Sequence, residues 1–305
     1  TGIQPQADLT TLSSLQARMQ PAMQFEAGAC CQNRCLTGIQ PQADLTTLSS
    51  LQARMQPIPA NYAAWWMCLL PVAAMKQAGL PMPFFIKMDD VEYALQIKEQ
   101  VVMMTGVCVW HENFHLKYAP WNEYYITRNG CITYALHGQA KNALAVTLEL
   151  WRTVLHLLFL HRYDTAKFVL QGYRDFLRGW KSLQKMDAIT LHRQILQQQQ
   201  AATEQFQIDC TEVPNSIPQV SFFEATRAAV QKQKSVFLFH PFTKKGFYAS
   251  RKKGTAFQLL LKMGGISLRM LATYRSVVQG FQKNRTVLCE DAAWNRRNQH
   301  NSKGK

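Results

Sequence analysis

The sequence contains 8 cysteines, but no two of them are separated by only two residues. They stand at positions 30, 31, 35, 68, 108, 131, 210 and 289, and most of them lie in apolar runs. Zinc sites and disulfide frameworks use tighter, patterned spacing, so both are disfavoured. We therefore expect reduced, buried thiols.

An uninterrupted apolar stretch of membrane-spanning length is also lacking. The most apolar long segment, residues 143–160, contains Glu149, Arg152 and His156. Ionisable side chains inside a membrane span are costly, so an amphipathic helix buried against a core is the better prediction. No signal peptide is visible, and we expect a cytoplasmic protein that can lie peripherally on the inner face of the plasma membrane.

Acidic residues are few relative to basic residues in the second half of the chain. Residues 1–140 carry 8 Lys and Arg against 9 Asp and Glu, whereas residues 141–305 carry 26 against 10, which accounts for the net charge of +15. A basic surface suits an anionic membrane, an acidic ligand or a nucleic acid. No nucleic-acid-binding motif is present, so we expect no nucleic-acid partner.

The string TGIQPQADLTTLSSLQARMQP occupies residues 1–21 and recurs unchanged at residues 37–57. Structural repeats diverge and continue over three or more units. An identical copy that occurs twice instead indicates a recent duplication or an assembly error. Residues 1–57 are therefore interpreted as a duplicated, irregular and partly artefactual segment.

The pattern over residues 58–139 predicts an α/β region. Residues 61–79 are mostly apolar and predict a buried helix, or a helix broken near Pro71. A β-prone run, Phe84–Lys87, leads into the acids Asp89, Asp90 and Glu92. Helical character follows over residues 93–100, and a buried strand with a break is predicted over 101–110.

Residues 140–294 predict a mostly helical domain. Helical spacing runs over 141–180, 183–206, 221–233 and 256–282, with a possible break at Gly264-Gly265. The run Phe237–Phe247 reads as a loop or a short strand. The polar tail 295–305 is predicted to be disordered and basic.

Asp89 and Asp90 are the first candidates for chemistry, because acids that follow a strand and precede a helix occupy the usual site of α/β folds. Such a carboxylate can act as a general base or hold a cation. Helix capping explains the same pair, since Asp is favoured at the first turn of a helix. Both interpretations stay open.

Three further residues invite two interpretations each. His111 can ligate a divalent metal, but a lone His is often structural. Trp65 and Trp66 are adjacent, so at least one can leave the core and offer a face to a sugar ring, or both can be core residues. The stretch Asn122–Asn129 suits a pocket wall or a contact between domains.

Four stretches together resemble the family 2 galactofuranosyltransferases, over about residues 22–135. They are FEAGA (25–29), YAAWWMCLLP (62–71), LPMPFFIKMDDVEYALQ (80–96) and VWHENFHLKYAPWNEYYITRN (109–129). The resemblance implies the C-terminal part of a GT-A (Rossmann-like) domain followed by a helical C-terminal domain. It also implies an inverting hexosyltransferase, UDP-galactofuranose as donor, Mn²⁺ or Mg²⁺, and a cell-envelope polysaccharide or lipid-linked glycan as acceptor.

The resemblance also implies roles for single residues. Asp90 corresponds to the general base and Asp89 to a residue that orients the acceptor or the base. His111 corresponds to a metal ligand. The acceptor contacts correspond to Trp65, Trp66 and Glu26.

The sequence departs from the family at several points. The family's metal site needs an Asp-x-Asp motif, and none occurs in these 305 residues. Met88 stands where relatives often carry Gly or Trp, and Gln96 where Arg is common. We therefore expect the acceptor half of a site without most of the donor half, a fragment that is inactive alone.

The basic half offers a candidate membrane surface. Its cations Lys244, Lys245, Arg251, Lys252 and Lys253 are interleaved with aromatic residues, although a solvated basic loop has the same composition. The alternative function is a non-catalytic remnant that acts as a basic membrane- or partner-binding module. A homo-oligomer stays open in both cases.

Overall fold

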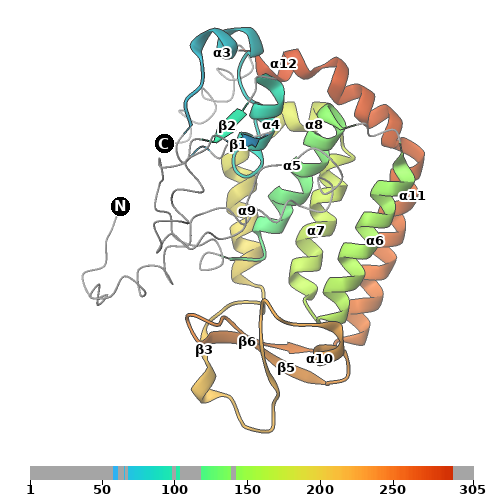
Figure 1. The fold of residues 1–305 in the computed structure, drawn as a ribbon. Helices are drawn as coiled ribbons and strands as arrows, with labels where there is room; N and C mark the ends of the chain where they lie inside the picture. Colours follow the sequence, from blue (N-terminus) through green and yellow to red (C-terminus); the bar gives the residue numbers. More distant parts are fainter. Residues whose placement is uncertain are drawn as a thin grey trace, which may run out of the picture.

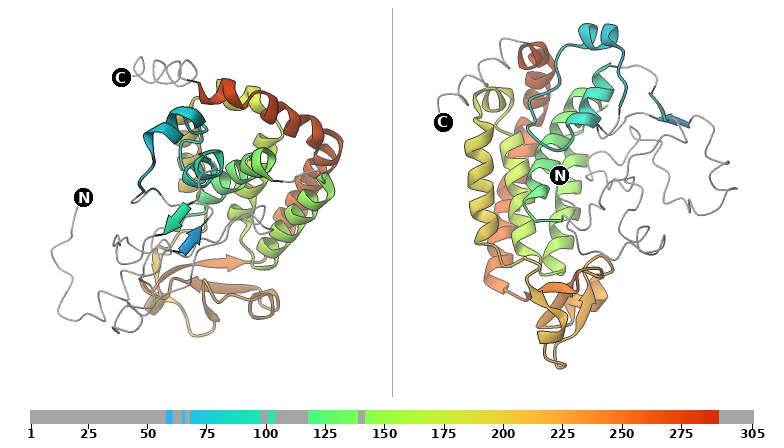
Figure 2. Two further views of the ribbon diagram at one scale, coloured as in Figure 1. Left: turned by 45° about the horizontal axis from the view of Figure 1, so that its top comes forward. Right: turned by 90° about the vertical axis from the view of Figure 1, so that its left-hand side faces the viewer.

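The structure is a computed structural model that describes residues 58–60, 65, 68–97, 101–103, 118–138 and 142–290. Helices α5, α6, α7, α9 and α11 stand side by side, with a small sheet at one end and α3, α4 and α12 at the other (Figures 1 and 2). The elements are β1 (Ile58–Ala60), α3 (Val72–Ala78), α4 (Asp89–Ile97), β2 (Val101–Met103), α5 (Asn122–His137), α6 (Ala143–Phe159), α7 (Tyr163–Phe176), α8 (Trp180–Lys185), α9 (Ala188–Gln200), β3 (Ile208–Asp209), η3 (Cys210–Glu212), β4 (Gln219–Ser221), α10 (Arg227–Gln231), β5 (Ser235–Phe239), β6 (Lys245–Ser250), α11 (Lys253–Lys283) and α12 (Arg285–Cys289).

The bundle follows from apolar residues at helical spacing. In α6 the buried side chains recur every three or four residues, and Asn142 caps the helix by accepting a hydrogen bond from the Leu144 N–H. This stripe joins α7 and α11 in the largest core cluster. The helical spacing predicted over 141–180 and 183–206 is confirmed by α6, α7, α8 and α9.

Helix α5 lies in the first predicted region, residues 58–139, and α7 in the second. The two helices nevertheless pack closely against each other. A Cβ atom at Gly172 of α7 would lie 2.8 Å from the Thr127 Cβ and 2.8 Å from the Tyr124 carbonyl oxygen. The two helix backbones can approach this far only because residue 172 has no side chain.

The variant Gly172→Ala is therefore expected to lower the free energy of unfolding by about 1–3 kcal/mol, because α5 and α7 must separate. Gly264→Ala is the matched control, since no atom lies within 4 Å of a Cβ placed there. In a helix interior this change should stabilise by about 0.5–1 kcal/mol. Urea unfolding measures both, and changes of the same sign would contradict the close packing.

Helix α11 spans 31 residues without interruption, so the predicted break at Gly264-Gly265 is wrong. Buried residues on both sides of the glycines, such as Leu259 and Met270, hold the helix against the same core. That tertiary contact outweighs the low helix propensity of glycine. Among the helices of the described ranges, none is both long and apolar enough to span a membrane.

The small sheet has the strand order β3-β6-β5-β4, with β4 parallel to β5 and the other pairs antiparallel. Alternate residues of β5 and β6 point into a second apolar core. The strand interpretation of Phe237–Phe247 is thus confirmed as a hairpin. The helix predicted over 221–233 is confirmed only for α10, because the segment before it pairs with β5 or forms a turn.

The segment before the acids is less regular than predicted. Among the described residues of 61–79, a helix begins only at Val72, directly after Pro71, and Leu69 is 90% exposed. The prediction of a buried helix is therefore wrong, whereas the predicted interruption near Pro71 agrees with the helix start. The duplicated segment up to residue 57, residues 104–110 of the predicted strand and the tail from 295 lie outside the described residues.

Candidate functional site

The residues that lead into the candidate acids form a tight turn, so the β-prone interpretation of Phe84–Lys87 is wrong. Phe85, Lys87 and Met88 have φ angles of 76°, 65° and 67°, in the left-handed region. Residues with a Cβ disfavour this region by about 1–2 kcal/mol each. Surrounding contacts must therefore hold the turn in place.

Asp89 and Asp90 follow this turn and form the start of α4. Both are half-buried, and burial raises the pKa of the Asp90 carboxyl from 3.8 to about 6. The negative charge of Asp89 adds to this increase, while a hydrogen bond from the Val91 N–H and the positive charge of Lys87 oppose it. Burial also raises the pKa of Asp89.

Two other aspartates show what ordinary capping looks like in the same chain. Asp187 accepts hydrogen bonds from the N–H groups of Ile189 and Thr190, and Asp209 accepts one from Thr211. The pKa of the Asp187 carboxyl lies below 3.8 mainly because the Thr190 hydroxyl also donates to it, with a smaller effect from the two N–H groups, and the bond from the Thr211 N–H lowers the pKa of Asp209. Asp89 and Asp90 differ in the direction of the shift, so capping alone does not explain them.

Glu92, the third acid of the cluster, points away from the pair. Its side chain is completely buried, where it lies 2.7 Å from His137 Nε2 and 3.9 Å from Arg285 Nη2. Glu92 therefore links α4 to α5 and α12, and gives His137 a structural role. The acidic cluster thus provides a pair of carboxylates at the candidate site.

Trp65 lies beside α4 and is 40% exposed, so it is not a core residue. Its ring meets the Tyr93 ring edge to face, with the centroids 5.7 Å apart. Cys68, which the sequence did not mark, is close enough for the Asp90 charge to raise the pKa of its thiol, in addition to the effect of burial. The structure therefore brings Trp65 and Cys68 to the helix that carries Asp89 and Asp90.

Three predicted site residues lie outside the described residues. They are Glu26, Trp66 and His111. Their roles stay predictions.

Arg128 and Asn129 of α5 contact the turn before Asp89, and they were not singled out from the sequence. The Arg128 guanidinium donates to the Phe84 carbonyl, and the Asn129 amide donates to the carbonyls of Ile86 and Lys87. The only signal in the sequence was the mixture of polar and aromatic residues over 122–129.

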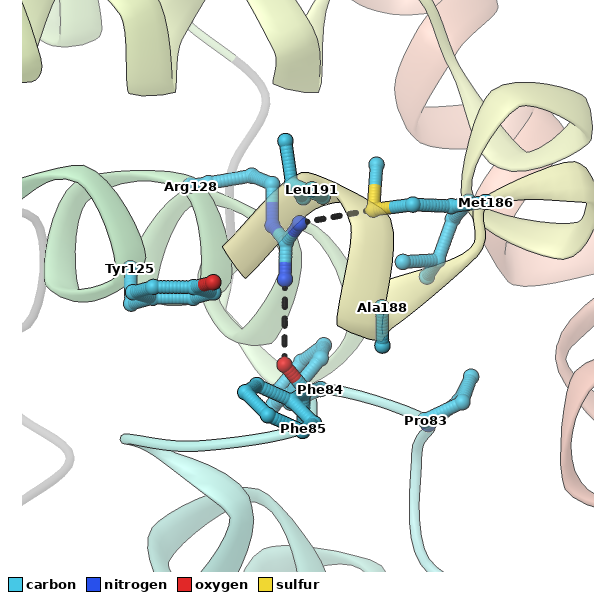
Figure 3. Close-up of a pocket in the computed structure, with 9 residues that line it drawn as sticks. Pro83, Phe84, Phe85, Tyr125, Arg128, Met186, Ala188 and Leu191 are labelled. Carbon is cyan, nitrogen blue, oxygen red and sulfur yellow. Dashed lines mark hydrogen bonds between the residues drawn. The ribbon is translucent and has the colours of Figure 1, made fainter. Parts of the chain in front are cut away.

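A small, open pocket lies beside this contact (Figure 3). Its walls are mostly apolar and aromatic, with Arg128 as the charged lining residue; Asp89 and Asp90 do not line it. The guanidinium already donates to Tyr124, Met186 and Phe84. The pocket is therefore distinct from the acidic pair.

The predicted membrane-surface cations form two groups. Lys244 and Lys245 stand at the start of β6, and Arg251–Lys253 follow its end; all five are exposed. A strand rises about 3.3 Å per residue, so the two groups are separated by roughly 20 Å. They do not form one compact cluster.

No protein-family model matches the chain. The chain is 32% identical to galactofuranosyltransferase GlfT2 of Mycolicibacterium smegmatis over 131 residues, which cover 41% of this chain and 20% of that protein. It is also 32% identical to GlfT2 of Mycobacterium tuberculosis over 130 residues, which cover 40% and 20%. This chain thus matches about a fifth of the length of these relatives. Over about two fifths of its own length it is related to galactofuranosyltransferases.

Proposed function

We propose that the chain carries the acceptor side of an inverting, family 2 glycosyltransferase site with a GT-A fold. The proposed reaction transfers galactofuranose from UDP-galactofuranose to a cell-envelope polysaccharide or a lipid-linked glycan. The relationship to two galactofuranosyltransferases supports the reaction class. The observation that carries the proposal is the half-buried pair Asp89–Asp90, with a pKa of about 6 at Asp90.

Asp90 has the chemistry that a general base needs. A carboxyl with a pKa of about 6 is mostly ionised at neutral pH, yet it accepts a proton more readily than an ordinary aspartate. In the proposed step Asp90 removes the proton of the acceptor hydroxyl. The hydroxyl oxygen then bonds to the anomeric carbon, and the bond from that carbon to UDP breaks.

Neighbouring side chains would position the acceptor. In the proposal Asp89 orients the hydroxyl, and the exposed face of Trp65 packs against the acceptor sugar, with Trp66 and Glu26 as further contacts. Trp65 has 40% of its surface available for this contact. The ring–ring contact with Tyr93 fixes its orientation.

A Mn²⁺ or Mg²⁺ ion that neutralises the diphosphate is part of the proposal, with His111 as one ligand. Within the described ranges, no group of three or more His, Cys, Asp or Glu side chains is placed to hold a metal ion. The described residues therefore do not form such a site by themselves, and no step is assigned to a metal.

A direct transfer assay tests the proposal. The 305-residue chain and the product of its full open reading frame are each incubated with UDP-galactofuranose, Mn²⁺ and a galactofuranosyl acceptor, and the glycan products are weighed by mass spectrometry. We expect transfer only from a product that also contains an Asp-x-Asp motif. The proposal would be contradicted if a product that contains the motif neither transfers galactofuranose to the acceptor nor hydrolyses UDP-galactofuranose.

A second candidate function is binding to an anionic membrane surface, and α11 favours it. This helix contains no acidic residue and five Lys or Arg residues, and it exposes Phe257, Leu261 and Leu268. The neighbouring α6 exposes Leu148 and Trp151, and the Trp151 indole donates to Ser267 of α11 at 2.9 Å. Apolar side chains beside cations are typical of helices that lie in a membrane interface.

Sedimentation with lipid vesicles tests this second function. The double variant Leu261→Gln/Leu268→Gln is expected to bind vesicles that contain phosphatidylserine at least about 10-fold more weakly, since a buried Leu contributes about 1.5–3 kcal/mol. Gln279→Ala, at an exposed polar position of the same helix, should bind like the unmodified chain. Equal binding to uncharged vesicles would contradict a preference for anionic membranes, and self-association without vesicle binding would contradict any membrane role.

A further inference from the structure

The turn over residues 84–88 needs an external support. Three of its residues have left-handed φ angles and none of them is glycine, so the isolated segment would favour other conformations. Its ends are anchored by two completely buried side chains, Phe84 and Met88. These anchors fix where the turn begins and ends, but leave the peptide groups between them to be held by hydrogen bonds.

Two adjacent residues of α5 supply those hydrogen bonds. Asn129 Nδ2 donates to the carbonyl oxygens of Ile86 and Lys87, each at 2.9 Å, which uses both of its hydrogens. Arg128 Nη2 donates to the Phe84 carbonyl oxygen at 3.1 Å. Both side chains are buried, so water cannot easily replace these contacts.

The two donors are themselves fixed, and Figure 3 shows Arg128 with its hydrogen bonds to Met186 and to the Phe84 carbonyl. Arg128 Nε donates to Asn129 Oδ1 at 2.8 Å, and Nη1 donates to the Tyr124 hydroxyl and to Met186 Sδ. The guanidinium also lies 5.2 Å from the centre of the Tyr124 ring. α5 thus presents a preformed set of donors to the turn, and Asp89 and Asp90 follow the last residue of the turn without a linker.

We propose that Arg128 and Asn129 are positioning residues, which hold the turn 84–88 so that the Asp90 carboxyl stays at the half-buried place where it meets the acceptor. This inference rests on the proposed function for the role of Asp90. The effect of Arg128 on Asp90 is geometric, since the charges that act on the Asp90 pKa are those of Asp89 and Lys87.

The variant Asn129→Asp isolates this role in the full 305-residue chain. A carboxylate still accepts the hydrogen bond from Arg128 Nε, but it offers no donor to the carbonyls of Ile86 and Lys87. We expect hydrogen exchange of the amides of residues 85–91 to become at least about 10-fold faster. We also expect the titration midpoint of Asp90, followed by carbon-13 NMR of the carboxyl group, to fall as the carboxyl gains water, because the new carboxylate at position 129 stays paired with Arg128 and opposes this fall only weakly.

Tyr124→Phe is the matched control. It removes one hydrogen bond of Arg128 at an equally buried position of α5, but leaves the three hydrogen bonds to the turn in place. Exchange over 85–91 and the Asp90 midpoint should therefore stay unchanged. An unchanged midpoint in Asn129→Asp, or equal changes in both variants, would overturn the positioning role.

A failure to fold and a failure of the proposed reaction can both be told apart from a failure of the positioning role. If Asn129→Asp does not fold, Arg128→Lys takes its place. It retains the charge but removes the guanidinium bonds to the Phe84 carbonyl, Asn129, Tyr124 and Met186, so the same directions of change are expected. If the Asn129 variant behaves as expected but no sugar transfer is found in the complete protein, the positioning of Asp90 stands and the proposed reaction fails.

Discussion

Replacing Asp90 with asparagine is expected to raise the free energy of unfolding of the chain at pH 7–8 by about 1–3 kcal/mol. The stabilisation arises because the ionised carboxylate is held in a half-buried position that favours its neutral form. Asparagine has the same shape, carries no charge and can still accept the hydrogen bond from the Val91 N–H. Catalytic groups often destabilise the fold that holds them.

The stabilisation expected from Asp90→Asn depends on pH. The pKa of Asp90 is raised from 3.8 in the unfolded chain to about 6 in the folded chain. Between these values the folded chain binds more protons, so its free energy of unfolding falls as the pH rises from 4 to 6. The advantage of Asp90→Asn should therefore be full above pH 6 and disappear below pH 4, in urea unfolding curves measured across this range.

Asp187→Asn is the control for the stability measurement. Asp187 caps α9 and the pKa of its carboxyl is lowered, so removing its charge should slightly destabilise the chain at neutral pH. Opposite signs in the two variants separate a functional carboxylate from a cap. In the complete transferase, Asp90→Asn should lower kcat at least about 100-fold and leave donor binding nearly intact; turnover within a few-fold of the unmodified enzyme would exclude Asp90 as the base.

Glu204→Ala is expected to lower the free energy of unfolding by about 3–5 kcal/mol. The Glu204 carboxylate is 3% exposed and accepts hydrogen bonds from the backbone N–H groups of Asp164 and Thr165 at the start of α7. It also lies 3.8 Å from the Arg162 guanidinium. Alanine would leave two buried N–H groups and a partly buried cation without these partners.

Two further variants, Glu204→Gln and Glu212→Ala, are expected to cost less stability than Glu204→Ala. Glu204→Gln keeps an acceptor for the two N–H groups and should cost less, about 0–1 kcal/mol, because burial raises the pKa of the Glu204 carboxyl and so opposes the benefit of its charge beside Arg162. Glu212→Ala, at an exposed position of η3, should change stability by less than about 0.5 kcal/mol. Urea unfolding followed by circular dichroism measures all three, and a loss below 1 kcal/mol in Glu204→Ala would show that water replaces the carboxylate.

The sequence predicted the helices of the bundle because their signal is local. Val146, Leu150 and Val154 report one buried face within α6, whatever lies opposite that face. The two glycines Gly264-Gly265 led to a wrong prediction of a helix break because a local signal does not include contacts with other helices. Those contacts keep α11 helical at this point. The strand β4 was missed because its pairing with β5 depends on residues more than a dozen positions away.

The candidate site was predicted in part. Asp90 and Trp65 were identified through motifs, and the structure places both beside α4. The turn before Asp89 was misread as a strand because Phe84, Phe85 and Ile86 are β-forming residues. The turn is held instead by Arg128 and Asn129, more than 40 positions away. Only tertiary structure reveals such a contact.

Helix α12, the last helix among the described residues, packs against the segment that precedes Asp89 and Asp90. The Leu80 N–H donates to the Cys289 carbonyl of α12, and Cys289 Sγ lies 3.4 Å from Met82 Sδ, across 207 positions of sequence. Contacts between such distant residues form late in folding. During synthesis, Asp89 and Asp90 therefore leave the ribosome long before α12 does. Chains stopped before residue 285 should lack the α12 contacts to residues 80–82, next to the candidate site, even when their bundle has formed.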